Sequence, residues 1–299
     1  MIIDFHTHIG DFRRYPEDPH QGFTFDSLVA RLDEEGIDKA VFLPIYASPD
    51  FIYPYFVLGD RMSIRDQVAD AGGYRERLIP FGNLDPRWMA RPGADFSLIL
   101  DWFQEQGCRG IGEITANIPF DDPRVIKMVQ EVGTRGWPVV FHGTSMHSGD
   151  YGLQDDPGSP RLERLLQQAP EAKLVGHGPG FWAEIAANPS PQDKGGYPEG
   201  PIEEEGSLPR LLRQYGNLYC DISAGSGYNA LTRDREYGLH FLEEFQDRIL
   251  FATDRTDARP EGQMPHLPWL KELLAHGQLT QAIFDKIACQ NALALIGLG

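Results

Sequence analysis

The sequence is poor in cysteine, in long apolar runs and in positive charge. Its three cysteines, Cys108, Cys220 and Cys289, lie far apart and none belongs to a CxxC pair. An odd, sparse set of this kind argues against a disulfide framework and indicates reduced thiols, as in cytoplasmic proteins. No apolar run approaches the ~20 residues that a membrane-spanning helix needs, so no membrane partner is expected. The first predicted strand begins at Ile2, so no cleavable signal peptide is expected.

Basic residues are outnumbered by acidic ones. Lysine and arginine number 27 against 44 aspartates and glutamates, which gives a formal net charge of −17. Because an acidic surface repels phosphate backbones, this balance argues against a nucleic-acid partner. The hydrophobic content of 41% and the charged content of 24% are ordinary for a soluble globular protein. We therefore expect a cytoplasmic protein that acts on a small molecule.

Strand-like and helix-like segments alternate along the whole chain. Strands are predicted at 2–8, 37–45, 78–84, 108–115, 137–142, 172–177, 217–223 and 248–254. Helices are predicted at 24–36, 61–72, 95–107, 121–136, 159–168, 207–215, 234–246, 265–275 and 279–297. This alternation predicts an α/β fold, a (β/α)8 TIM barrel that forms a single domain over residues 1–299. The alternative, a doubly wound open sheet, needs a glycine-rich first turn, and the first turn here is His-Thr-His.

The loops that follow the strands are long, and the loops that follow the helices are short. In a TIM barrel the loops after the strands build the active-site face. The longest of them, 178–209, is expected to fold over the site as a lid.

Five of the predicted strands end in potential metal ligands. These residues are His6 with His8, Glu113, His142, His177 and Asp254. Side chains alternate between the faces of a strand, so Asp4, His6 and His8 are expected to share the face toward the barrel axis. Imidazoles together with a carboxylate suit a first-row divalent cation such as Zn2+. A lone HxH pair is a weak signal, but its combination with the later strand ends indicates a metal-dependent enzyme.

In these residues the chain resembles the amidohydrolase superfamily, in particular the amidohydrolase-related branch of hydrolases and non-oxidative decarboxylases. The resemblance covers nearly the whole chain and rests on Asp4-Phe5-His6-Thr7-His8, Glu113, His142, His177, Ala252-Thr253-Asp254 and Asn291-Ala292. It implies a metal ion held by His6, His8, His142 and Asp254. It also implies that His177 is a ligand at a second metal position or an acid/base group. Glu113 stands where relatives carry a bridging carboxylated lysine or a glutamate, and the absence of a lysine leaves one ion or two ions open. Zn2+ is the expected ion and Mn2+ the alternative.

A metal-dependent hydrolase is the first functional hypothesis. A divalent cation lowers the pKa of bound water toward ~7 and polarises a carbonyl oxygen. The expected reaction is the attack of this metal-activated water on an amide, lactone or ester carbonyl of a small molecule. Asp254, His177 and Glu113 are the predicted catalytic residues, and Asp254 or His177 moves the protons. The competing interpretations are a helix cap for Asp254 and an ion pair with Arg109 for Glu113.

Two other functions fit the same ligand set. One is a non-oxidative decarboxylase, a lyase that acts on an unsaturated or aromatic carboxylic acid, and the other is a barrel that binds a ligand without catalysis. Arg255 is the predicted substrate-binding residue, because a guanidinium after the eighth strand can bind a carboxylate through a bidentate fork. The competing interpretation for Arg255 and for Arg259 is a salt bridge with a neighbouring acid.

The loop after the second strand is rich in aromatic residues: Tyr46, Phe51, Tyr53, Tyr55 and Phe56. Three roles are open for them, namely the wall of a pocket, packing within the loop and a homodimer contact.

Overall fold

Parallel strands form a closed barrel. The structure, a computed structural model, describes residues 1–46, 50, 63–88, 95–146, 151–259 and 264–299, so Phe51, Tyr53, Tyr55 and Phe56 of the aromatic loop lie outside it. In barrel order the strands are β1 (Ile3–Thr7), β2 (Lys39–Phe42), β3 (Leu78–Pro80), β4 (Ile111–Ile114), β5 (Pro138–Ser145), β7 (Lys173–His177), β8 (Leu218–Asp221) and β9 (Ile249–Leu250). Neighbouring strands pair in parallel. Isolated bridges between Gly82 and Ile111 and between Thr7 and Arg255 complete the ring. The predicted TIM barrel is thereby confirmed.

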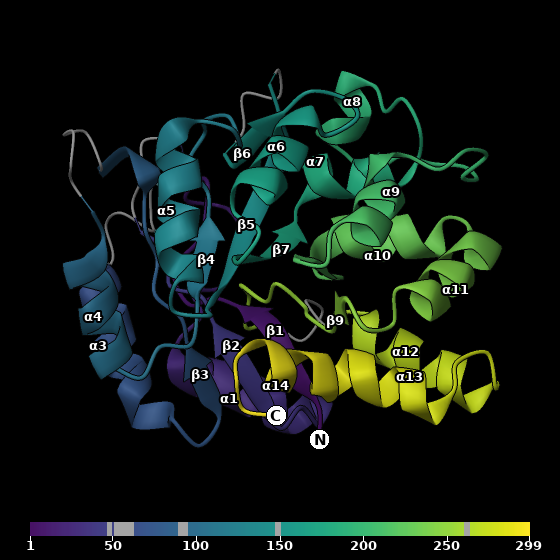
Figure 1. Ribbon diagram of the computed structural model, residues 1–299. Helices are drawn as coiled ribbons and strands as arrows, with labels where there is room; N and C mark the ends of the chain where they lie inside the picture. Colours follow the sequence, from purple (N-terminus) through teal and green to yellow (C-terminus); the bar gives the residue numbers. More distant parts are fainter. Residues whose placement is uncertain (47–49, 51–62, 89–94, 147–150, 260–263) are drawn as a thin grey trace.

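Helices surround the barrel (Figure 1). They include α1 (Phe25–Glu35), α3 (Ile64–Ala71), α4 (Ser97–Glu105), α5 (Pro123–Gly133), α6 (Pro160–Gln168), α9 (Ser207–Gln214), α11 (Arg235–Glu244), α12 (His266–Ala275) and α13 (Gln281–Asp285). Helix α1 begins after Thr24, whose side chain accepts from the Ser27 amide in a capping box, and it ends at the left-handed Gly36. Helix α5 begins after Asp122, with a proline in its first turn. Among the described residues, no helix has the length and apolar content to cross a bilayer.

The barrel has an outer and an inner apolar layer. The outer layer lies between strands and helices and includes Ala40 and Phe42 of β2 with Leu28 of α1. The inner layer lies inside the barrel, where Ile3, Phe5, Val41 and Val140 join Ala292 and Leu295 of α14 (Asn291–Leu295). Figure 1 shows both chain ends beside α14. The C-terminal helix, reached from α13 through the π-helix η5 (Lys286–Gln290), therefore closes this end of the barrel.

Strand β1 contains a bulge that reorients its side chains. Asp4 pairs with Ala40 of β2, and Thr7, three residues further on, pairs with Phe42, only two residues further on. The extra residue in β1 is a β-bulge. Because Ala40 and Phe42 face the outer layer, Asp4 and Thr7 face outward as well. The expectation that Asp4 shares the inward face of His6 is therefore wrong, and Asp4 instead accepts hydrogen bonds from Thr253.

Strand β4 has the same irregularity. Ile111 pairs with Val139 of β5, and Ile114 pairs with Phe141. All four of these residues belong to the outer layer. Two residues of β4 thus stand opposite one residue of β5, and Glu113 is one of these two. The bulge turns the Glu113 side chain toward the barrel interior.

Several short elements lie in the loops after the strands, and the sequence analysis did not predict them. They are β6 (Leu153–Asp155), η2 (Pro86–Trp88), α7 (Pro179–Trp182), η3 (Ala183–Ile185), α8 (Pro191–Lys194) and α10 (Ala224–Thr232), while η1 (Gly72–Tyr74) extends α3. Helix α10 contains two glycines, which weaken a helical sequence pattern. Gly227 lies so close to β8 that a Cβ there would stand 2.4 Å from the Ile222 carbonyl carbon. Close packing against the strand end therefore takes precedence over helix propensity.

Candidate metal centre

The rings of the two histidines at the end of β1 face each other through their Nε2 atoms. His6 and His8 are buried, and their Nε2 atoms lie 2.9 Å apart. His6 Nδ1 lies 2.8 Å from Asp221 Oδ2, and His8 Nδ1 lies 2.8 Å from the Leu43 carbonyl oxygen. A carboxylate and a carbonyl only accept hydrogen bonds, so each Nδ1 carries a hydrogen and the two Nε2 atoms face each other. This arrangement requires a positive charge between them, either a proton or a metal cation.

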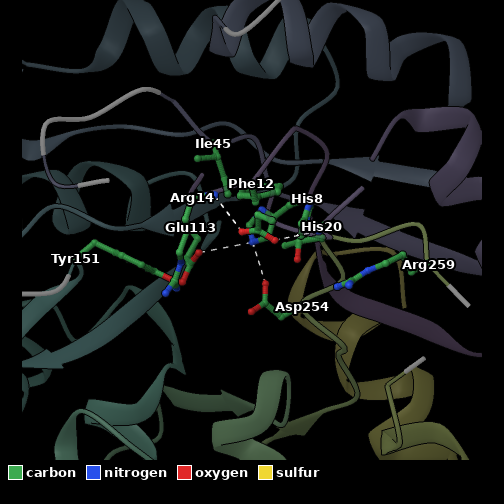
Figure 2. Close-up of a pocket in the computed structure, with 11 residues that line it drawn as sticks. His8, Phe12, Arg14, His20, Ile45, Glu113, Tyr151, Asp254 and Arg259 are labelled. Carbon is green, nitrogen blue, oxygen red and sulfur yellow. Dashed lines mark hydrogen bonds and ion pairs between the residues drawn. The ribbon is translucent and has the colours of Figure 1, made fainter. Parts of the chain in front are cut away.

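Two carboxylates face this histidine pair. Glu113 Oε2 lies 3.8 Å from His6 Nε2 and 3.6 Å from His8 Nε2. Asp254 Oδ1 lies 3.6 Å and 3.3 Å from the same two nitrogens. Asp254 has a left-handed φ of 57°, a conformation that concentrates at functional sites when the residue is not glycine. Figure 2 shows Glu113 and Asp254 approaching His8 from different directions.

Glu113 also contacts a second pair of histidines. Its Oε1 atom lies 2.8 Å from His142 Nδ1 and 3.7 Å from His177 Nε2. His142 and His177 are register partners on β5 and β7, so the sheet places them at the same height of the barrel. The Oδ2 atom of Asp254 lies 3.8 Å from His177 Nε2. The Glu113 carboxylate therefore lies between two histidine pairs.

These contacts define two ligand groups that share one carboxylate. The first group consists of His6, His8 and Glu113, and the second consists of Glu113, His142 and His177. Within each group, one donor atom per residue lies within 4.8 Å of the others. Because these nitrogen and oxygen donors suit a first-row divalent cation, the described residues contain a His/Glu cluster fit for a metal ion. All the predicted ligands and acid/base residues converge here: His6, His8, Glu113, His142, His177 and Asp254.

The charges within the centre shift the protonation of its groups. Burial alone would lower the pKa of His6, but the charge and the hydrogen bond of Asp221 outweigh it and raise that pKa well above its usual value. For His177, burial would likewise lower the pKa, but the charge of Asp221 outweighs it and raises that pKa. Burial alone would raise the pKa of Glu113 and of Asp254, but the surrounding histidines lower both. The site thus favours ionised carboxylates and positive charge, which is also the electrostatic setting for a bound cation.

Asp221 is a residue of this centre that the sequence analysis did not single out. It is fully buried, and its carboxylate contacts His6 and His177 at 2.8 and 3.1 Å. The available signal was its place at the end of predicted strand 217–223, equivalent to the positions of the other strand-end ligands. Because its partners are the Nδ1 atoms, Asp221 contacts both rings on the side away from their Nε2 atoms.

A cavity of about 250 Å3 opens over the cluster. His8, Glu113 and Asp254 contribute to its wall, and the other lining residues are Phe12, Arg14, Asp18, His20, Ile45, Tyr151, Thr256 and Arg259. Figure 2 shows Arg259 extending toward the cluster from one side and Tyr151 from the other. Both ring nitrogens of His20 are buried and have no hydrogen-bond partner within the described part of the chain. Segment 178–209, expected to form a lid, contributes none of these lining residues, and within it a buried ion pair joins Lys194 to Glu184 at 2.6 Å.

Arg255, the predicted substrate-binding residue, does not line this cavity. It is a bridge partner of the outward-facing Thr7, so its side chain points away from the barrel interior while that of Asp254 points inward. The guanidinium is buried and pairs with Glu35 of α1 at 2.5 Å. Arg259, four residues further on, does line the cavity, and it also forms a salt bridge with Asp257, the competing interpretation for this residue.

Solved structures of known proteins share this fold over their whole length. A probable 2-pyrone-4,6-dicarboxylic acid hydrolase from Acinetobacter baumannii, with citric acid bound, is 16% identical, with 99% of each chain covered and a TM-score of 0.59. A 5-carboxyvanillate decarboxylase from Novosphingobium aromaticivorans, complexed with manganese and a nitrobenzoic acid, is 16% identical, with 100% of this chain and 96% of that chain covered and a TM-score of 0.61. An amidohydrolase from Burkholderia multivorans with bound zinc is 14% identical, with 100% of each chain covered and a TM-score of 0.58.

A search of curated protein sequences gave no match. A family model, by contrast, matches nearly the whole chain. The model is described as amidohydrolase, and it spans residues 3–298. The arrangement of His6, His8, Glu113, His142, His177 and Asp254 in a closed barrel agrees with this match. The protein belongs to the amidohydrolase family.

Proposed function

We propose that the protein is a metal-dependent hydrolase that adds water across an amide, lactone or ester bond of a small molecule. The observation that carries this proposal is the position of Glu113 between the two histidine pairs. One carboxylate oxygen faces His6 and His8, and the other faces His142 and His177. A shared carboxylate of this kind suits two cations at neighbouring positions, an arrangement common in hydrolytic sites.

The proposed metal is Zn2+, with Mn2+ as the alternative. His6, His8, Glu113 and Asp254 would hold the first ion, and Glu113, His142 and His177 the second. This proposal departs from the expected set of His6, His8, His142 and Asp254, because His142 contacts Glu113 from the side of His177. A divalent cation in this position supplies a Lewis acid that polarises the substrate carbonyl and lowers the pKa of water. If a single ion occupies the first group, His177 serves instead as an acid/base group. Its Nε2 atom lies 3.8 Å from Asp254 Oδ2.

The proton acceptor in this proposal is Asp254. Its side chain is 24% exposed, more than that of any histidine or carboxylate in the cluster, and it lines the cavity. Because the neighbouring histidines lower its pKa, Asp254 is ionised and able to accept a proton from the attacking water at neutral pH. Its Oδ2 atom faces His177 at 3.8 Å, so the same carboxylate can return the proton to the leaving group.

The substrate-binding groups are proposed from the cavity wall. Arg259, whose guanidinium also pairs with Asp257, and Arg14 supply positive charge. The buried ring nitrogens of His20 have no hydrogen-bond partner among the residues that the structure describes. Phe12 and Ile45 form apolar parts of the wall. A cavity of this size and composition suits a small polar molecule with a short apolar part.

A non-oxidative decarboxylase is the second candidate function. The observation that favours it is the presence of two arginines at the cavity of a chain with a net charge of −17. Guanidinium groups hold carboxylates in a defined orientation. An unsaturated or aromatic carboxylate bound in this way would be protonated on the carbon that carries the carboxylate group. The bond between that carbon and the carboxylate would then break and release CO2.

One experiment separates the two functions. The purified protein, loaded with Zn2+ or with Mn2+ and compared with a chelator-stripped sample, is incubated with a panel of esters, lactones, amides and aromatic carboxylic acids. Metal-dependent cleavage with uptake of one water supports the hydrolase. CO2 release without water uptake, in the absence of any ester, lactone or amide cleavage, would replace it with the decarboxylase. A chain that retains no divalent metal contradicts both.

A further inference from the structure

A single buried carboxylate joins the two histidine pairs of the metal centre. Asp221 ends β8 and its side chain is inaccessible to solvent. Its Oδ2 atom lies 2.8 Å from His6 Nδ1, and its Oδ1 atom lies 3.1 Å from His177 Nδ1. His6 belongs to the first ligand group and His177 to the second, so one side chain contacts both groups.

The neighbouring serine fixes the direction of these hydrogen bonds. Ser223 donates its main-chain N–H to Asp221 Oδ1 at 3.1 Å and its hydroxyl to the same atom at 2.5 Å. The hydroxyl oxygen also lies 2.8 Å from His177 Nδ1. Since its one hydrogen points to Asp221, this oxygen accepts from His177. Whether His177 donates directly to Asp221 or through Ser223, the acceptor at the end is the Asp221 carboxylate.

This arrangement selects one tautomer for both rings. A carboxylate can only accept, so His6 and His177 both carry a hydrogen on Nδ1. Their Nε2 atoms then face the cluster, with His6 Nε2 at 2.9 Å from His8 Nε2 and His177 Nε2 at 3.7 Å from Glu113 Oε1. The other two histidines are held differently: His8 donates to the Leu43 carbonyl, and Nδ1 of His142 faces Glu113 itself.

We propose that Asp221 is a positioning residue that couples the two metal positions. It holds His6 and His177 in the Nδ1–H tautomer at the same time, so cation binding in either ligand group depends on the same carboxylate. This inference rests on the proposed function in one respect, that divalent cations occupy the cluster. A purely structural role is a poor alternative, because the tertiary contact from Trp182 Nε1 goes to the main-chain oxygen of Asp221 and survives a change of side chain.

The variant Asp221→Asn tests the coupling with almost no change in shape. An amide has one accepting oxygen and one donating nitrogen, so it satisfies only one of the two rings. The ring that faces the amide nitrogen has to accept a hydrogen bond at Nδ1 and therefore carries its hydrogen on Nε2. A protonated Nε2 atom cannot bind a metal ion. We expect Zn2+ affinity, measured by competition with a chromogenic chelator, to fall by about 10–100-fold. In Asp221→Ala both rings lose their acceptor, and the loss should be at least as large.

A matched control is Asp155→Asn. Asp155 is also a buried carboxylate at a strand end, but it accepts from the main-chain N–H groups of Arg161 and Leu162 rather than from a histidine. This variant should lose stability while it keeps wild-type Zn2+ affinity. Equal losses of Zn2+ affinity in Asp155→Asn and Asp221→Asn would overturn the proposal, because the effect would then reflect general destabilisation.

A second measurement needs neither metal nor turnover. Nitrogen-15 NMR of the histidine rings in chelator-stripped wild-type protein should show both His6 and His177 protonated on Nδ1, and Asp221→Asn should move one ring to the Nε2–H tautomer. An Nδ1 without hydrogen on either ring of the wild type, or unchanged tautomers and Zn2+ affinity in Asp221→Asn, overturns the proposal even if the hydrolase is correct. A wild type that binds no divalent metal but shows the Asp221-dependent tautomers contradicts the proposed function and supports the positioning role.

Discussion

Glu113 Oε1 lies 2.8 Å from Nδ1 of His142, on the neighbouring strand of the barrel. Burial would raise the pKa of Glu113, but the hydrogen bond from this histidine is the largest of the effects that lower it. The carboxylate is therefore kept ionised between the two histidine pairs. Its charge is the feature that the two ligand groups have in common.

Glu113→Gln should weaken metal binding in both ligand groups. The amide keeps the size of the side chain but removes the charge and one of the two accepting oxygens. We expect bound metal, measured by elemental analysis after dialysis, to fall for both ions, with loss of turnover and an unchanged far-UV circular dichroism spectrum. The control is Glu163→Gln, which removes an ion pair with Arg210 on the outer helices. Full metal content in Glu113→Gln would show that this carboxylate is not a shared ligand.

His6→Ala should abolish metal retention in the first ligand group while it leaves the barrel folded. The ring contributes Nε2 to the first group, and the bulge in β1 is fixed by main-chain pairing rather than by the ring. Stoichiometric metal together with full activity in this variant would contradict the ligand assignment. Thermal unfolding with and without added Zn2+ provides a second readout, because a ligand that binds only the folded state raises Tm.

The strands and the polar residues at their ends could be predicted because both depend on residue type and period. Apolar runs ending in His6, His142 or Asp254 identify strands and their functional ends without any tertiary information. The bulges in β1 and β4 could not be read in this way, since a strict period of two assigns Asp4 and His6 to one face. The pairing with Ala40 and Phe42 of β2 reverses this assignment for Asp4.

The same limit explains why the sequence could not place the Arg255 side chain. Residues 254 and 255 follow the last strand, and the sequence shows that both are charged but not which one faces inward. The bridge between Thr7 and Arg255 decides this, and it joins residues at opposite ends of the chain. The contacts of Asp221 are hidden in the sequence for a related reason, because only the closed barrel brings His6 and His177 next to it.

Arg255→Gln should affect stability rather than substrate affinity. It breaks a buried ion pair with Glu35, and the loss of one partner of such a pair costs about 3 kcal/mol of unfolding free energy. Arg259→Gln should raise KM and leave the free energy of unfolding nearly unchanged, because Arg259 lines the cavity. Chemical denaturation and KM for any substrate found in the panel are the two measurements. A raised KM in Arg255→Gln with unchanged stability would restore the original interpretation.

The buried His266 should make folding stability depend on pH. Burial lowers its pKa to about 4, while its Nε2 atom lies 3.0 Å from the Ala224 carbonyl oxygen. Between this value and the unfolded pKa of about 6.5, the unfolded chain binds a proton that the folded chain does not. The contribution to stability is therefore complete above about pH 6.5 and is lost as the pH falls toward 4, by at most about 3 kcal/mol.

The difference between wild type and His266→Gln isolates this effect. The raised pKa values of Asp4, about 7, and Asp155, about 6, give a pH dependence of the opposite sign, and they are common to both proteins. Denaturant unfolding at about pH 7 and about pH 4.5 should show a smaller loss of stability on acidification in the variant. Parallel pH profiles for the two proteins would exclude His266 as the source.

The apolar layer around Phe5 and Val140, with α14 beneath it, leaves the described cavity open at the opposite end of the barrel. In the part of the chain that the structure describes, substrate therefore enters and products leave through the same opening. A fragment that stays bound after bond cleavage blocks the next molecule, so product release limits the maximal rate wherever it is slower than the chemical step. That fragment should also act as a competitive inhibitor, which makes product inhibition a direct guide to the chemical identity of the substrate.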